Sequence, residues 1–438
     1  MAFSLISGGT PTPFPGLFSW AFGLSVDTEP NWTVIPAKDV KDTNSLGIEF
    51  QRVFEPSDVT LGTADWLLNE YSRHQAFNAA DINGNSSRIL VLATDNFWHV
   101  YDINTDGNND VTTVTYAHPV VTGGLVLAEG VWHPTDQDLF TYVGKDAATF
   151  VMYQWNCATQ QQTVVYDWTT QMRARHPAWA AAGGMWNTDE GMYSDDGRYA
   201  AFKVHAPYDE NDVPYLGMVC VDLQLNTILG SIDGGAEPNY ITMSPSGAYV
   251  VPGWYYSGGP NNDGGAWRYD KDFTNPVRVS VTGGEHADCC VGADGDDYYV
   301  SWEYGPTSLI PGYTSQSTMF ATNMRTQVVN TLYSPYAVTV TDAMHYSGRC
   351  IDLPGYVVTS HYGADNRDGI YLLNIHDGTI RKIGHAHVIS DPGYYHQPHA
   401  CVSPSGKHIL ATTDADQTSA NPYSIMFHIP INSIPPAI

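Results

Sequence analysis

A segment of one design recurs seven times along the chain and constrains the fold more than any other feature. Each copy has an apolar or aromatic entry, a turn rich in Ser, Pro, Asp and Gly, and then an aromatic and β-branched strand. The copies begin at Asn78, Trp132, Tyr193, Met243, Gly292, Ile351 and Val402. The turn glycines of the last five copies are spaced by roughly 50 residues, which is room for four strands and their connections. The repeat therefore predicts an all-β fold, a seven-bladed β-propeller.

The turn inside the repeat has a physical cause. In "MSPSGAYVV", Pro245 restricts φ at one corner, and Gly247 supplies a positive φ before the second strand of a hairpin. The alternative, a β-sandwich pair beside an unrelated domain, does not explain so regular a turn. We assign residues 71–438 to the propeller as a single domain. Residues 1–70 have no clear repeat, and we expect an N-terminal extension that contributes a closing strand.

Composition and charge restrict the partners. The 40 Gly, 27 Pro, 28 Tyr and 12 Trp favour many short strands. The formal net charge of −27 repels nucleic acid and anionic membranes, so we expect neither as a partner. No apolar run is long enough to span a membrane, and the N-terminus lacks the basic region of a secretory signal. We expect a monomer that is secreted or otherwise extracellular, with a virion component as the alternative.

The last three blade entries share histidine and cysteine, in the strings "EHADCC", "MHYSGRC" and "YYHQPHAC". Equivalent entries converge on the axis of a propeller, and imidazole with thiolate suits tetrahedral zinc. We predict a structural Zn²⁺ site, with Ca²⁺ and Mn²⁺ as alternatives; its candidate ligands are His286, Cys290, His345, Cys350 and His399. The competing interpretation is that the cysteines are core residues and the histidines are hydrogen-bonded in the channel wall. A disulfide is not expected, because no spaced cysteine framework is present.

A second group of candidates lies in the first blade, in "NEYSRHQAFNAAD" and "NFWHVYD". His74 and His99 are candidate proton-transfer residues, since a neutral imidazole accepts a proton at neutral pH. The phenols of Tyr193 and Tyr240 are further acid-base candidates. Cationic and polar candidates for binding an anionic substrate are Arg73, Gln75, Asn78 and Arg175. For each residue taken singly, the alternative is an ordinary surface histidine or strand tyrosine.

The ordered entry strings, from "YSRHQAFNAAD" through "EPNYITMSPSGAYVV" to "QPHACVSPSGKHILATTD", resemble seven-bladed propeller polysaccharide lyases. The resemblance is greatest to ulvan lyases and more distant to oligogalacturonate lyases. It implies β-elimination at a uronic acid, with His and Tyr as acid and base, an Arg or His that neutralises the carboxylate, and a zinc ion that supports the fold. By this resemblance, His74 and His99 match the paired histidines of the first blade, and Tyr193 and Tyr240 both fit the tyrosine position.

No arginine matches the neutraliser position of these lyases, for which Arg175 and Lys203 are substitutes, so the exact substrate stays open. We predict a lyase acting on an acidic, uronate-containing polysaccharide, with ulvan favoured. A non-catalytic propeller that binds a glycan or a protein is the alternative. A glycoside hydrolase is disfavoured, because no well-defined pair of carboxylates is apparent.

Overall fold

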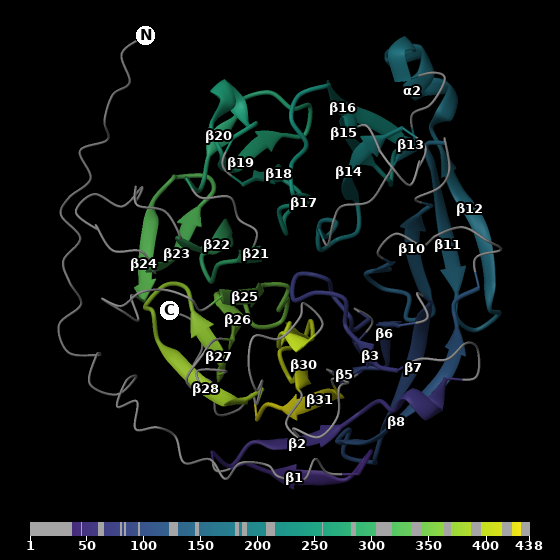
Figure 1. Ribbon diagram of the computed structural model, residues 1–438, viewed down its shortest axis with the longest axis vertical. Coiled ribbons are helices and arrows are strands. Elements are labelled where there is room, and N and C mark those ends of the chain that lie inside the picture. The colour runs from purple at the N-terminus through teal and green to yellow at the C-terminus, as the bar shows by residue number, and fades with distance from the viewer. Residues whose placement is uncertain are drawn as a thin grey trace.

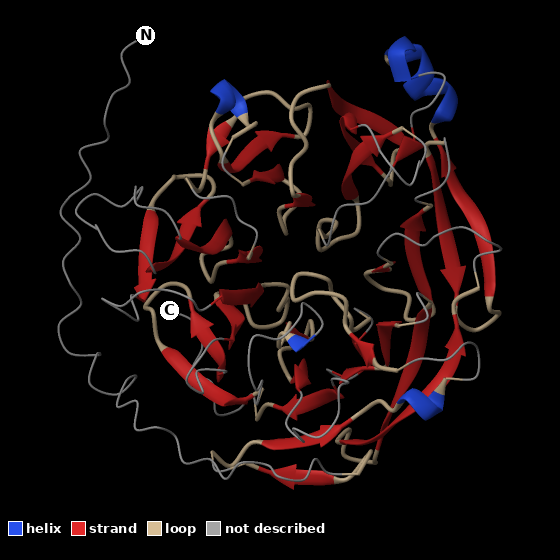
Figure 2. Ribbon diagram, in the orientation of Figure 1, coloured by secondary structure: helices blue, strands red, loops and turns tan. Residues whose placement is uncertain are grey.

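Six four-stranded sheets and one five-stranded sheet stand as blades around a central axis in the computed structural model of the chain (Figures 1 and 2). The predicted seven-bladed β-propeller is therefore confirmed. The structure describes residues 37–44, 46–59, 65–78, 81–82, 85–94, 97–121, 130–144, 149–179, 184–185, 191–206, 215–255, 257–281, 286–303, 318–333, 343–362, 369–386, 396–413 and 423–430.

The first three blades follow one another along the chain, each an antiparallel sheet. The first contains β3 (Leu67–Leu68), β6 (Arg88–Ala93), β7 (Trp98–Thr105) and β8 (Val111–Pro119). The second contains β9 (Val131–Trp132), β10 (Leu139–Val143), β11 (Val151–Asn156) and β12 (Gln161–Asp167). The third contains β13 (Gly184–Met185), β14 (Tyr199–His205), β15 (Tyr215–Asp222) and β16 (Thr227–Asp233).

The next three blades repeat this order. The fourth contains β17 (Tyr240–Met243), β18 (Tyr249–Trp254), β19 (Gly265–Asp270) and β20 (Val277–Arg278). The fifth contains β21 (Ala287–Val291), β22 (Asp297–Glu303), β23 (Thr318–Asn323) and β24 (Val329–Tyr333). The sixth contains β25 (Ala343–Ser347), β26 (Tyr356–Tyr362), β27 (Gly369–Asn374) and β28 (Ile380–His385). In Figure 1, β17, β21 and β25 lie near the centre of the ring.

The seventh blade joins the two ends of the chain. Its C-terminal strands are β29 (Cys401–Val402), β30 (His408–Thr413) and β31 (Tyr423–His428), and its N-terminal strands are β2 (Glu49–Arg52) and β1 (Lys41–Thr43). Strand β2 pairs antiparallel with β31, so that Phe50 lies opposite Phe427. Because backbone hydrogen bonds connect strands from opposite ends of the sequence, the ring is closed without a covalent link.

The remaining elements are short and connect strands. They are the hairpin of β4 (Asp81–Ile82) and β5 (Asn85–Ser86), the helix α2 (Thr169–Arg175), and the 3₁₀ turns η1 (Pro56–Asp58), η2 (Pro177–Trp179) and η3 (Pro260–Asn262). Helix α2 lies at the outer edge of the ring (Figure 1). Among the residues that the structure describes, no helix is long and apolar enough to cross a membrane.

The repeated turn has the backbone geometry that its glycine predicts. Gly197, Gly247, Gly295 and Gly406 have φ values of 67°, 74°, 79° and 73°. In each of these turns the glycine N–H donates to the carbonyl oxygen three residues earlier. A side chain is strained in this left-handed region, so the glycines allow the inner strand to turn into the second strand of the blade.

The core lies between neighbouring blades, which is why the inner strands are apolar on both faces. One cluster packs Cys290 and Val300 of the fifth blade against Met344 and Val357 of the sixth. Successive strand residues point to opposite faces, so Cys289 packs on the other side, against the fourth blade.

Candidate functional site

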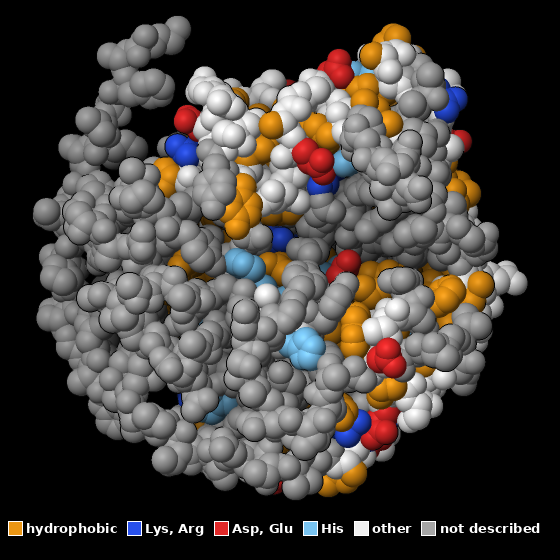
Figure 3. Space-filling model, in the orientation of Figure 1, with side chains coloured by type: hydrophobic (Ala, Val, Ile, Leu, Met, Phe, Trp, Pro, Cys, Tyr) orange, Lys and Arg blue, Asp and Glu red, His pale blue; other side chains and the backbone are white. Residues whose placement is uncertain are grey.

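Three histidines from consecutive blades meet at one end of the axis. His286 directly precedes β21, His345 lies within β25, and His399 precedes β29. The ring centroids of His286 and His345 are 4.5 Å apart, and those of His345 and His399 are 4.4 Å apart. Nδ1 of His286 lies 3.1 Å from Nδ1 of His345. We call these three residues the histidine cluster. In Figure 3, histidine side chains are visible near the middle of the face, beside a basic side chain.

Two further side chains contact the histidine cluster. The hydroxyl of Tyr71 lies 2.8 Å from Nδ1 of His286, and the ring of Tyr71 meets the ring of His345 edge-on at 5.0 Å. Oε1 of Gln397 lies 2.7 Å from Nε2 of His345 and accepts a hydrogen bond from it. Gln397 was visible in the "YYHQPHAC" string, but sequence reasoning missed Tyr71, whose only signal was its place at the start of the first blade entry.

Burial keeps all three rings neutral. It lowers the pKa of His286 to about 3, and the positive charge of Arg73 acts in the same direction. Burial, followed by repulsion from His286, lowers the pKa of His399 to about 3. Burial and the two neighbouring histidines lower the pKa of His345 well below its ordinary value. Neutral imidazole is the form that binds metal ions.

A buried arginine lies next to the histidine cluster. The guanidinium of Arg73 stands 4.8 Å from the ring centre of Tyr71 and 4.1 Å from that of Tyr240, so the cation is held between two phenols. Its Nη1 donates to the carbonyl oxygen of Ala287 at 3.3 Å. The hydroxyls of Tyr240 and Tyr299 are 2.8 Å apart. Burial raises the pKa of Tyr240 well above its ordinary value, the Tyr299 hydroxyl acts in the same direction, and Arg73 opposes both.

The donor chemistry of this end fits a divalent cation, because neutral imidazoles and an amide oxygen are available together. A separation of 3.1 Å between two nitrogens suits neighbouring ligands of one ion at bond lengths of about 2.1 Å. Within the described part of the chain, however, no group of three or more His, Cys, Asp or Glu residues is arranged as a ready metal site. The nitrogens at ligand spacing are those of His286 and His345, and Gln397 holds His345 through its other ring nitrogen.

The two cysteines predicted as ligands lie elsewhere, which corrects the sequence interpretation. Cys290 packs between the fifth and sixth blades, and Cys350 packs between the sixth and seventh. Burial raises the pKa of both thiols, so neither forms a thiolate readily. All six cysteines are free and buried. The mixed set of imidazole and thiolate that pointed to zinc is therefore not assembled.

The predicted histidine pair of the first blade is not brought together. Nε2 of His74 lies 2.9 Å from the carbonyl oxygen of Gly130, which faces the second blade. His99 lies on β7, the third strand outward, and its ring faces Tyr116. Because Trp98 contacts His74 and the next residue points to the opposite face of the strand, His74 and His99 lie on opposite sides of the sheet. This corrects the expectation that His74 and His99 act as a pair.

The other predicted site residues are divided between the two ends of the axis and the edge of the ring. Among the predicted substrate-binding residues, Arg73 reaches the histidine cluster, whereas Arg175 ends helix α2 at the exposed perimeter. Asn78 is committed to its own loop, where its Oδ1 accepts hydrogen bonds from the N–H groups of Ser87 and Arg88 at 2.9 and 3.0 Å. Of the two tyrosines, Tyr240 contacts Arg73, and Tyr193 lies at the other end.

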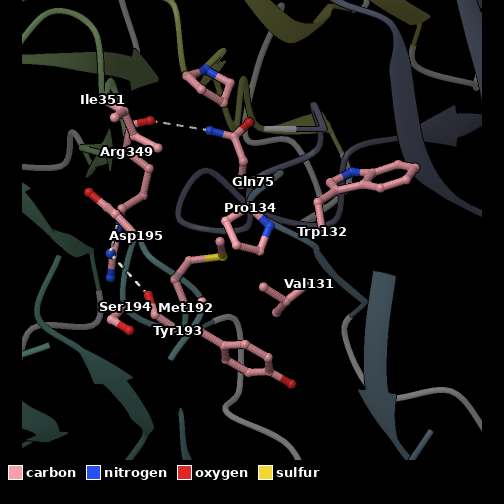
Figure 4. A pocket seen from close by; sticks show the side chains of 12 residues that line it. Gln75, Val131, Trp132, Pro134, Met192, Tyr193, Ser194, Asp195, Arg349 and Ile351 are labelled. Carbon is pink, nitrogen blue, oxygen red and sulfur yellow. Dashed lines mark hydrogen bonds and ion pairs between the residues drawn. The ribbon is translucent and has the colours of Figure 1, made fainter. Parts of the chain in front are cut away.

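Arg349 lies at the other end of the axis, and the sequence did not single it out. Its Nη1 donates to Asp195 Oδ1 at 2.8 Å and to the Tyr193 carbonyl at 3.1 Å. Its Nη2 donates to the carbonyl oxygen of Met243. Gln75 Nε2 donates to the carbonyl oxygen of Val402 at 2.8 Å and lies 3.4 Å from the backbone carbonyl oxygen of Arg349. Figure 4 shows Arg349, Asp195 and Gln75 around this pocket, with the Tyr193 phenol directed away from Arg349.

The polar side chains at this second end join neighbouring blades, so few of their hydrogen-bonding groups remain to bind a substrate. Arg349 links the third, fourth and sixth blades, and Gln75 links the first blade to the seventh. Much of the pocket wall is apolar, with Val131, Trp132, Pro134, Met192 and Ile351 among its lining residues. The hydrogen bonds of Gln75 are committed to backbone groups, including the N–H of Phe77 at 3.1 Å. The expected substrate role of Gln75 is therefore not supported by its position.

A third charged group lies beside the histidine end. Lys203 on β14 is buried, and its Nζ donates to Glu237 Oε1 at 2.7 Å and to the carbonyl oxygens of Pro238 and Asn239 at 3.3 and 3.4 Å. Nε2 of His205 lies 3.2 Å from the same Glu237 oxygen. Burial opposes ionisation of Glu237, but the hydrogen bond from His205 and the charge of Lys203 outweigh it and lower its pKa to about 2.

Comparison with known proteins identifies the fold. No protein-family model matches the chain, and no curated protein matches it in sequence. Among solved structures, it is similar to an oligogalacturonate lyase in complex with manganese, with a TM-score of 0.56, 17% identity, and coverage of 90% of this chain and 96% of that one. An oligogalacturonate lyase from Vibrio parahaemolyticus matches with a TM-score of 0.56, 12% identity, and coverage of 90% and 97%. At this identity the likeness extends to the seven-bladed architecture along nearly the whole of both chains.

Proposed function

We propose that the protein is a polysaccharide lyase that cleaves uronate-containing chains by β-elimination, with ulvan as the favoured substrate and the histidine end as its active site. The observation that carries this proposal is Arg73, a buried cation held between two phenols beside three neutral histidines. The architectural likeness to oligogalacturonate lyases supports the same class of chemistry.

The reaction requires a cation, a proton acceptor and a proton donor. A base removes the proton from the carbon next to the carboxylate, the carbon–oxygen bond at the β position breaks, and its electron pair leaves with the oxygen as the double bond forms. Charge accumulates on the carboxylate in the transition state, so a nearby cation lowers the barrier. Arg73 fits this role, because its guanidinium matches the planar geometry of a carboxylate.

We assign the proton transfers to the two phenols that flank Arg73. Tyr240 is protonated at neutral pH, since burial raises its pKa, and it donates its proton to the leaving oxygen. Tyr71 lies on the other side of the guanidinium; it acts as a phenolate that has already released its own proton to solvent, and its oxygen accepts the carbon-bound proton. Arg73 stabilises the phenolate that forms at either position.

A divalent cation, for which we propose Mn²⁺, completes the site. His286, His345 and His399 would hold it, with Gln397 orienting His345 through its hydrogen bond to Nε2, because these neutral nitrogen donors suit such an ion and no thiolate lies among them. When bound, the ion supplies a second positive charge that withdraws electrons from the substrate carboxylate. The solved oligogalacturonate lyase in complex with manganese supports this choice over zinc.

Mass spectrometry of the products tests the proposed reaction. Purified protein with added Mn²⁺ is incubated with ulvan, and each new oligosaccharide is weighed. We expect products that are one water molecule lighter than those of hydrolysis, and their absence in the Tyr240→Phe variant. Products with the mass of hydrolysis would contradict the lyase assignment, and an unchanged substrate would favour a glycan-binding propeller without activity.

A further inference from the structure

The Lys203–His205–Glu237 group combines a buried lysine and a buried histidine with a carboxylate that reaches the surface. The side chains of Lys203 and His205 are 2% and 5% exposed, whereas that of Glu237 is 40% exposed. Here one oxygen of Glu237 binds both partners, and the side chain still reaches the surface.

This group is continuous with the histidine end. The segment 236–239 leads directly from Glu237 into β17, which begins with Tyr240. Three residues of extended chain span at most about 10 Å, so the Cα atom of Glu237 lies within about that distance of the Cα atom of Tyr240, whose ring contacts Arg73. Asn239, between them, has an exposed side chain, while its backbone oxygen accepts from Lys203. In Figure 3, an acidic, a basic and a histidine side chain lie together on the face that also shows the central histidines.

We propose that Glu237 and Asn239, supported by Lys203 and His205, form a further sugar-binding subsite that takes a ring beyond the two rings joined by the cleaved bond. The proposal rests on the proposed function and adds its substrate class: an acidic oligosaccharide longer than a disaccharide. Glu237 accepts hydrogen bonds from sugar hydroxyls, and the Asn239 amide donates to a ring or carboxylate oxygen. Lys203 fixes the Glu237 carboxylate in position and keeps it ionised.

Kinetics on substrates of different length test this subsite. The rate constant kcat/KM is measured for a disaccharide and a tetrasaccharide of the uronate that the wild-type protein cleaves. Glu237→Gln should lower the tetrasaccharide value by about tenfold, the effect of one lost charge-assisted hydrogen bond, and leave the disaccharide value nearly unchanged. Glu49→Gln is the matched control. Glu49 is 43% exposed and also pairs with a lysine, Lys41, but it lies on β2, an outer strand of the seventh blade.

A second variant and a binding measurement separate a failure of the subsite from a failure of the lyase assignment. Asn239→Ala leaves the Lys203–Glu237 pair intact, so it replaces Glu237→Gln if that variant fails to fold. Equal losses on both substrates, or no loss on either, overturn the subsite while leaving the lyase assignment in place. If the wild-type protein cleaves no uronate, calorimetric titration with a tetrasaccharide decides the subsite separately: weaker binding by both variants supports it, and unchanged or undetectable binding overturns it.

Discussion

Replacement of Arg73 by glutamine removes the cation on which the proposed reaction depends. The side chain is 4% exposed and contacts two phenols, at 4.8 and 4.1 Å, and one carbonyl oxygen. Each buried cation–π contact contributes up to about 2 kcal/mol, and the hydrogen bond contributes about 1 kcal/mol. Arg73→Gln should therefore lower the free energy of unfolding by at most about 5 kcal/mol.

Arg73→Gln should also lower kcat/KM, and by more than a loss of packing alone would cause. Loss of one preorganised electrostatic contact to the transition state costs about 100-fold or more in rate. Arg73→Gln should lower kcat/KM by at least that factor, and Arg73→Lys, which keeps the charge but loses the planar fork, should recover part of it. Initial rates at several substrate concentrations, measured below the unfolding transition of each variant, separate kcat from KM.

Arg268 provides a matched control for Arg73. Its guanidinium stands 4.5 Å from the ring of Tyr249, but it lies on β19, away from the axis. Arg268→Gln should cost about 1 kcal/mol of stability and leave kcat/KM unchanged. A folded Arg73→Gln variant with the kcat/KM of the wild-type protein would refute the reasoning, and so would an equal loss of activity in Arg268→Gln.

Three further predictions address the metal, the axis and the pH dependence. Cys290→Ala and Cys350→Ala should each destabilise the protein by about 2 kcal/mol in urea unfolding. The amount of bound Mn²⁺, measured by elemental analysis, should stay unchanged. Loss of the metal in either variant would show that its thiol is a ligand. Arg349→Met should lower the free energy of unfolding by about 3 kcal/mol, because Asp195 and the Met243 carbonyl lose their partner; an unchanged urea midpoint would contradict the role of Arg349 at the axis. Glu237 has a pKa lowered to about 2, so its contribution to stability is complete above pH ~4.5 and is lost as pH falls toward 2. After allowance for solvent screening, Glu237→Gln should lose about 1 kcal/mol at pH 7, and the difference from wild type should shrink across that acidic interval; a difference independent of pH in thermal unfolding would contradict the ion pair.

The blade architecture was predictable because its signal is local and repeated. Each turn glycine needs a positive φ within a few residues of sequence, and the structure has that φ at Gly197, Gly247, Gly295 and Gly406. The convergence of His286, His345 and His399 followed from the same repeat, since equivalent positions of neighbouring blades meet at the axis.

The side-chain directions within those entries were less predictable. Cys290 was predicted to bind one metal ion together with His286, but His286 lies before β21 begins, where the strict alternation of a strand does not yet hold. The backbone at His399 has φ of 37°, which also breaks the alternation between this residue and Cys401. No sequence pattern marks Arg349 as a site residue. Its hydrogen-bond partners, Asp195 and Met243, lie in other blades, each more than 100 residues from Arg349 in sequence.

The most direct test of the proposed active site is the ultraviolet absorbance of the unsaturated uronate formed by elimination. Wild-type protein is mixed with ulvan, polygalacturonate, alginate and glycosaminoglycans, first after chelation and then after addition of Mn²⁺. We expect a rise in absorbance on at least one of these polymers, strongest on ulvan, that is lost on chelation and restored by Mn²⁺. A flat trace on every polymer with Mn²⁺ present would contradict it.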